Sequence, residues 1–230
     1  MGIQNISILI ISSLTILLGF LVLRKKYKNP GNTWYFLMCL FGGGWGVMKA
    51  IELSSTSVYW HDFVFKFVMF FGIMAPLAYF MLAYNFIYKV KNLPKILLYF
   101  ISSVTIVLAI LSFAGVLKYV DAAIIDGVLY RNIIFWDYLI FVVYFFVYVF
   151  LGLIILFKKY TTAEGTHKNQ FRYLIIGTAL TFLVTGVVSV IFLLFNNFTY
   201  DWLGAIFLSI HLLIISHFLF IKPKIVASRE

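Results

Sequence analysis

The chain has 230 residues, 63% of them hydrophobic, and a mean hydropathy of +1.03, whereas soluble domains are roughly half apolar. This composition excludes an ordinary soluble domain. The net charge of +10 would favour a nucleic-acid partner in a soluble protein, but here it indicates membrane topology and attraction to anionic lipid, so no nucleic-acid partner is expected. Cys39 is the single cysteine, which excludes an intrachain disulfide and a cysteine-based metal cluster.

Seven apolar runs of about twenty residues follow one another along the chain. Each is long enough to cross a hydrocarbon core about 30 Å thick as a helix. The runs are continuous rather than alternating, which favours helices over a β-barrel. We therefore predict an all-α seven-transmembrane bundle over residues 1–221, followed by a tail at 222–230. The predicted helices cover residues 5–23, 33–53, 63–88, 97–116, 138–157, 171–195 and 202–221.

The basic residues between these runs fall mainly on one side. Fourteen of the eighteen lie after runs one, three and five or in the tail. The opposite loops carry five aspartates, including Asp121 and Asp201, with only Lys118 and Arg131 clearly among them. By the positive-inside rule, the amino terminus is outside and the carboxyl terminus is cytoplasmic. We expect a multi-pass protein of the cell membrane whose longest outer loop covers residues 117–137.

Glycine and proline mark two special helices. Gly42 and Gly46 are four residues apart, a spacing that lets another helix approach closely. Because glycine lowers helix propensity, some unwinding around Trp45 is also expected. Pro76 lies inside the third run, where it frees a backbone carbonyl and provides a flexing point.

Ionisable residues gather at the predicted outer end of the second and third runs. Lys49 and Glu52 share one helical face, and an ion pair of Glu52 with Lys49 or Lys66 is expected. The favoured interpretation is interfacial snorkelling. The alternative is the charged floor of a ligand pocket, although an interfacial tryptophan belt would account for the same tryptophans. The candidate ligand-binding residues are Trp45, Glu52, Tyr59, Trp60, Trp136, Asp137 and Trp202.

Polar side chains also occur inside runs six and seven. Thr178, Thr181, Thr185 and Ser189 form one stripe, for which helix packing is favoured over an ion or substrate path. His211 is expected to be an interior hydrogen-bonding pivot, with proton sensing as the alternative.

No cofactor is expected. His211 and His217 lie about 120° apart around the helix and cannot bind one metal together. His61 and His167 are expected in loops. Retinal would need a lysine in the middle of run seven, which has none before Lys222. Phosphate-binding glycine loops, His-Glu-x-x-His and Gly-x-Ser-x-Gly patterns are also absent from the sequence, so no enzyme activity is expected.

Several short patterns together resemble one family. These are the segment from Trp45 to Ser54, the Phe71–Pro76 step running into Phe80, Ala83 and Tyr84, the Asn169–Arg172 entry followed by Leu174 and Gly177, and Leu203-Gly204 with an Ile-Ser-His-Phe ending at Phe218. The chain resembles the amino-terminal seven-helix sensor region of bacterial histidine kinases. Related regions precede diguanylate cyclases.

The resemblance implies an input module in which a small or lipid-like ligand, or a membrane stimulus, shifts helix packing. Helix seven would pass the shift to a cytoplasmic output domain or partner protein, and the resemblance also implies a homodimer. No recognisable kinase domain precedes Glu230, so the chain is expected to be an isolated sensor region or a relative with a partner output. The alternatives are a small-solute transporter, with Lys49, Glu52, Lys66 and the hydroxyl stripe along its path, and a structural membrane subunit.

Overall fold

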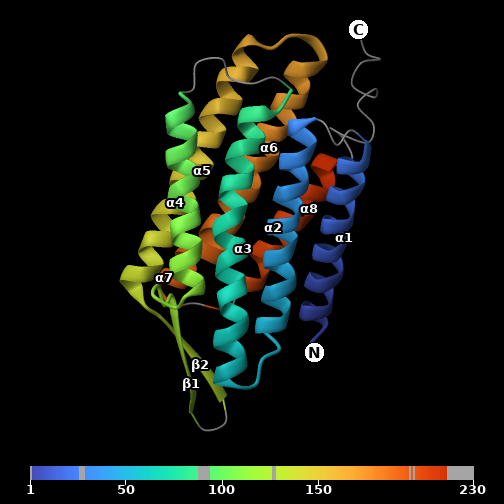
Figure 1. The fold of residues 1–230 in the computed structure, drawn as a ribbon. Coiled ribbons are helices and arrows are strands. Elements are labelled where there is room, and N and C mark those ends of the chain that lie inside the picture. The colour runs from blue at the N-terminus through green and yellow to red at the C-terminus, as the bar shows by residue number, and fades with distance from the viewer. Residues whose placement is uncertain are drawn as a thin grey trace.

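A computed structural model describes residues 2–25, 29–87, 94–125, 128–196, 198 and 200–216. Long helices lie side by side and a β-hairpin protrudes at one end (Figure 1). The elements are α1 (Ile3–Lys25), α2 (Pro30–Glu52), α3 (Val58–Asn85), α4 (Lys95–Phe113), β1 (Val120–Ile125), β2 (Val128–Ile133), α5 (Phe135–Thr162), α6 (Gly165–Gly186), the π-helical segment η1 (Val187–Ile191), α7 (Phe192–Leu194) and α8 (Asp201–Ile215). We call the end that carries β1 and β2 the hairpin end, and the end with Thr162 the basic end.

The described helices form an all-α membrane bundle, as the sequence predicts. Four of them, α1, α3, α4 and α5, are individually long and apolar enough to span a bilayer. The π-helical segment η1 links α6 to α7 within one helical run, because the residues at both junctions, Val187 and Ile191, keep right-handed helical angles. The stretch from α6 to α7 therefore corresponds to the predicted sixth helix.

Helix α2 packs against α1, α3 and α8, and its glycines make these contacts close. A methyl group added at Gly46 would meet Ser12 Cβ of α1 at 3.0 Å, and one at Gly42 would meet the Leu208 side chain of α8 at 3.2 Å. The predicted close approach is confirmed. The predicted unwinding around Trp45 is wrong, because α2 stays helical from Pro30 to Glu52. Packing against three helices outweighs the weak helix propensity of glycine.

The predicted outer loop at 117–137 contains an antiparallel hairpin that the sequence analysis did not predict. Val120 of β1 pairs with Ile133 of β2. The backbone N–H of Ile133 donates to Asn196 Oδ1 at 2.7 Å, which ties the hairpin to the segment between α7 and α8. The hairpin therefore lies against the helix ends rather than standing free.

Helix boundaries differ from the predicted ones most where less apolar residues precede an apolar run. Helix α3 begins at Val58 and α6 begins at Gly165, five and six residues before the predicted starts. His61 and His167 consequently lie in helices, so their placement in loops is wrong. The predicted tail and His217 lie outside the described residues, and the division of the chain at residue 221 stays a prediction.

Candidate functional site

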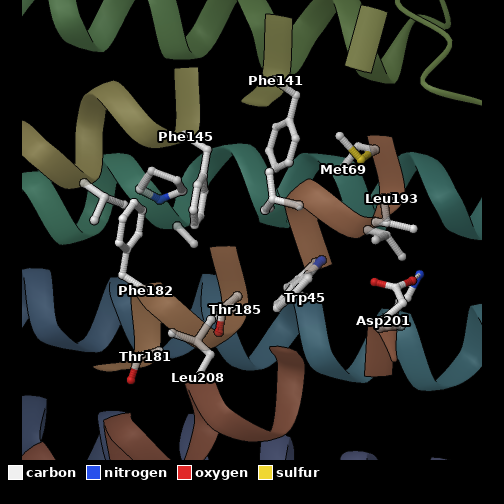
Figure 2. Close-up of a pocket in the computed structure, with 18 of the residues that line it drawn as sticks. Trp45, Met69, Phe141, Phe145, Thr181, Phe182, Thr185, Leu193, Asp201 and Leu208 are labelled. Carbon is white, nitrogen blue, oxygen red and sulfur yellow. Dashed lines mark ion pairs between the residues drawn. The ribbon is translucent and has the colours of Figure 1, made fainter. Parts of the chain in front are cut away.

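A cavity of about 100 Å³ lies inside the bundle among α2, α3, α5, α6 and α8. Aromatic and aliphatic side chains form most of its wall. In Figure 2, Phe145 and Phe182 lie toward one end, Asp201 lies at the other, and Trp45 lies between them. A water needs only about 10–15 Å³ on this measure, so the cavity has room for several waters or a small organic molecule.

The hairpin end of the cavity is closed by a buried charged cluster. Lys49 Nζ lies 2.6 Å from Glu52 Oε2 and also pairs with Asp201 Oδ2. All three side chains are at most 3% exposed. Lys49 and Glu52 meet because they are one turn apart on α2, whereas Asp201 is brought in by the first turn of α8. The cluster thus links the hairpin ends of α2 and α8.

Two further side chains contact the other carboxylate oxygen of Glu52, Oε1. Arg131 Nη1, on β2, donates to Glu52 Oε1 at 2.7 Å, and His61 Nε2 lies 3.0 Å from the same atom. The Arg131 guanidinium also lies over the Phe198 ring, 4.4 Å from its centre. Two cations, Lys49 and Arg131, therefore balance the two carboxylates. The pairing compensates the desolvation that makes isolated buried charges costly.

Farther along α8, the cavity has a polar region that is not charged. We call Tyr79, Thr178 and His211 the polar triad. The Tyr79 hydroxyl, the Thr178 hydroxyl and the His211 Nε2 atom are buried without a hydrogen-bond partner among the described residues. The two hydroxyls are near each other but do not reach hydrogen-bond geometry. The His211 ring packs against Gly177, next to Thr178. An unsatisfied buried polar group costs about 1–3 kcal/mol.

Seven of the candidate site residues line this cavity. They are Trp45, Lys49, Pro76, Thr178, Thr181, Thr185 and His211. The hydroxyl stripe thus faces the cavity with three members, while Ser189 has a side chain outside the described set. Glu52 lies behind Lys49 in the charged cluster.

The other predicted residues lie elsewhere. Tyr59, Trp60 and Trp136 are exposed by more than half, as expected of residues in an interfacial belt. Asp137 accepts a hydrogen bond from the Lys118 backbone at 2.8 Å. Trp202 packs with Ile8, Ala50 and Ala205. Lys66 does not join the charged cluster; its Nζ lies beside Gly115.

Four polar or charged residues of the site were not among those predicted from the sequence. Asp201, Arg131 and His61 complete the charged cluster, and Tyr79 completes the polar triad. A signal existed for Asp201, because it immediately precedes an apolar run and could have been read as an intramembrane acid. Arg131 had no such signal without the hairpin. Within the described ranges, no three His, Cys, Asp or Glu side chains come together as metal ligands would.

On the hairpin, two ionisable groups form an exposed pair. Lys118 Nζ donates to Asp121 Oδ1 at 2.7 Å. This hydrogen bond and the attraction between the charges lower the pKa of Asp121 and raise the pKa of Lys118. Tyr119, between them in sequence, is buried, and burial raises its pKa to about 12. The hairpin region thus has a solvent-exposed ion pair and a buried aromatic side chain that anchors it.

The fold and the site define a polytopic helical membrane protein with a cavity inside the bundle that is capped at one end by charged side chains. The family described as the N-terminal 7TM region of histidine kinase matches residues 7–221. The chain belongs to this family, and it is a membrane sensor input module of the kind that precedes a cytoplasmic signalling domain. A comparison with curated proteins found no match.

Proposed function

We propose that the module senses a ligand in the cavity and transmits its presence through α8 to a cytoplasmic kinase domain. One observation carries this proposal: α8 supplies both Asp201 to the charged cluster and His211 to the polar triad. The two residues are ten positions apart, which is about 15 Å along a helix. A change at either end of the cavity would therefore act on the same helix.

The mechanism we infer is a shift between two packings of α8 against its neighbours. A ligand shifts such an equilibrium only if it binds one packing more tightly than the other. Both polar regions offer such a difference, because movement of α8 would separate Asp201 from Lys49 and His211 from Gly177. On the predicted topology, α8 leads toward the cytoplasm, where the kinase domain would read the shift.

The test is a fusion of residues 1–230 to the catalytic core of a histidine kinase, assayed for phosphorylation in membranes. We expect Asp201→Asn and the milder Thr178→Val to change the basal output at least twofold. The matched control is Asp121→Asn, which removes a carboxylate that pairs only with exposed Lys118 among the described residues. Output that is the same in all four proteins, with normal folding and several linker lengths, would contradict the proposal.

One observation favours the transporter alternative enough to keep it. Thr178, Thr181 and Thr185 face the cavity rather than only a neighbouring helix. A transporter would release a small solute from liposomes, and Glu52→Gln would reduce the flux by loosening the charged cluster. Flux that depends on Glu52, combined with a kinase fusion that never responds, would favour transport over sensing.

A further inference from the structure

The polar triad is the part of the cavity whose chemistry is incomplete. Its members come from three helices, α3, α6 and α8, and all three line the same cavity. Each is more than nine-tenths buried, and each presents a polar atom without a partner among the described residues. Hydroxyls both donate and accept, and a neutral imidazole nitrogen does one or the other. The triad is therefore suited to a neutral group that both donates and accepts hydrogen bonds.

A charged ligand fits the cavity poorly. Among the described residues that line it, Lys49 and Asp201 carry the only full charges, and they pair with each other. The remaining carboxylate and guanidinium of the cluster, Glu52 and Arg131, also pair. An ionised ligand would lose its hydration without gaining a free counter-charge, which is strongly unfavourable in an apolar surrounding.

The wall between the two polar regions favours a flat ring. Trp45 and Phe141 lie toward the middle of the cavity, and Phe145 and Phe182 stack on each other with ring centres 6.0 Å apart and planes within 15° (Figure 2). Aromatic side chains prefer stacked or edge contacts with another ring. The volume of about 100 Å³ excludes a long chain and limits the ligand to no more than a single ring, since benzene is held by a larger apolar cavity of about 150 Å³.

We propose that the cavity binds a small, uncharged aromatic molecule with one hydroxyl group, of the phenol class, whose oxygen bonds to the polar triad. The ring lies among the aromatic side chains, and the hydroxyl replaces the hydrogen bonds that Tyr79, Thr178 and His211 lack. This assignment names the ligand class of the cavity on which the proposed function rests.

The test is direct binding of phenol to the full chain in lipid nanodiscs, with empty nanodiscs subtracted. Benzene and benzoate serve as the apolar and the charged comparison. We expect saturable phenol binding that is at least tenfold tighter than benzene binding, and no saturable binding of benzoate. Equal affinity for phenol and benzene, saturable benzoate binding, or no saturable phenol binding would each overturn the proposal.

Variants locate the site. Thr178→Val and Tyr79→Phe keep the shape of the side chain and remove one hydroxyl, so each should reduce the preference for phenol over benzene several-fold. Thr15→Val is the matched control, because Thr15 is buried on α1 and bonds to Ile11 and Ser209 outside the cavity wall. A preference that survives both cavity variants, or is lost equally in the control, would contradict the assignment.

A second readout does not depend on the variants. Phenol bound near Trp45 should quench the fluorescence of that tryptophan. The measurement uses a variant in which Trp34, Trp60, Trp136 and Trp202 are replaced by Phe, so that Trp45 is its single tryptophan. Thermal-shift measurements on this variant and on the unmodified chain check that the two bind phenol alike. Phenol that binds here without changing the kinase fusion supports the ligand class and contradicts the proposed function. If other compounds change the output of the kinase fusion and phenol does not bind, the proposed ligand class is contradicted and the proposed function is not.

Discussion

Lys49 is enclosed by helices, yet it keeps two carboxylate partners, Glu52 and Asp201. Burial of an ion pair contributes little net stability, because desolvation offsets the attraction. Removal of one partner is a different matter, since it leaves the other charges uncompensated. The cluster therefore specifies how α2 and α8 meet more than it strengthens the fold.

Lys49→Met should destabilise the protein by about 3–5 kcal/mol, because Asp201 would lose its buried cation. The free energy of unfolding in detergent or bicelles measures this loss. Adding Asp201→Leu to Lys49→Met should restore a large part of it, while Lys118→Met, at an exposed pair, should change little. A double variant no more stable than Lys49→Met would show that the charges are not coupled as described.

Tyr119 anchors the hairpin through burial, and this predicts a dependence on alkaline pH. Its pKa is raised to about 12 in the folded protein, above an ordinary value of about 10. A raised folded pKa gives stability that is fully present below pH 10 and is lost as the pH rises toward 12. Protease sensitivity of the hairpin should therefore increase across this range in the native protein. In Tyr119→Phe, the increase in protease sensitivity with pH should be smaller. A pH profile identical to that of the native protein would show that another group causes the increase.

At the scale of elements, the end of α3 depends on a side chain from α5. Lys159 is buried, and its Nζ donates to the carbonyl oxygens of Ala83, Tyr84 and Phe86 at 2.8, 2.8 and 3.0 Å. The last carbonyls of a helix lack partners within the helix and carry the negative end of its dipole. Lys159 supplies hydrogen-bond donors to these carbonyls and a positive charge near the negative end of the dipole. It thereby fixes α5 to α3 at the basic end.

Lys159→Met should cost about 1.5–3 kcal/mol, the range for hydrogen bonds to a charged group. It should also increase hydrogen exchange in the last turn of α3. The adjacent Lys158→Met is the control, because Lys158 is exposed and carries the same charge. Equal effects of the two substitutions would mean that charge at this end of the bundle, rather than the bond to α3, determines stability.

The helices could be predicted from sequence because each long helix corresponds to its own apolar run. The hairpin could not be predicted from hydropathy, since β1 and β2 are short, although the Asp126-Gly127 pair between them is a typical signal for a tight turn. The residues of the site differ in the same way in how far they could be predicted from the sequence. Lys49 and Glu52 were predicted because helical spacing alone brings them together, whereas Asp201 and Arg131 reach them only through tertiary structure.

On the scale of the whole molecule, the bundle has a carboxylate-bearing hairpin end and a basic end. The positive-inside rule predicts that the hairpin end is outside the cell. Cys39 is fully buried, so an introduced cysteine can report accessibility with little background. A membrane-impermeant maleimide should label Ala123→Cys on intact cells and Thr161→Cys only after permeabilisation. The reverse pattern would invert the topology and place the charged cluster on the cytoplasmic side.

Helix α8 contributes a residue to each polar region of the cavity. The proposed function depends on transmission of the ligand-induced shift through this helix. The most direct measurement is the distance between spin labels at Ile214→Cys on α8 and Ile154→Cys on α5, both of which are about half exposed. We expect Asp201→Asn to shift the distance distribution by about 1–2 Å, the scale of helix shifts in switching proteins. An unchanged distribution in a variant whose kinase output has changed would contradict transmission through α8.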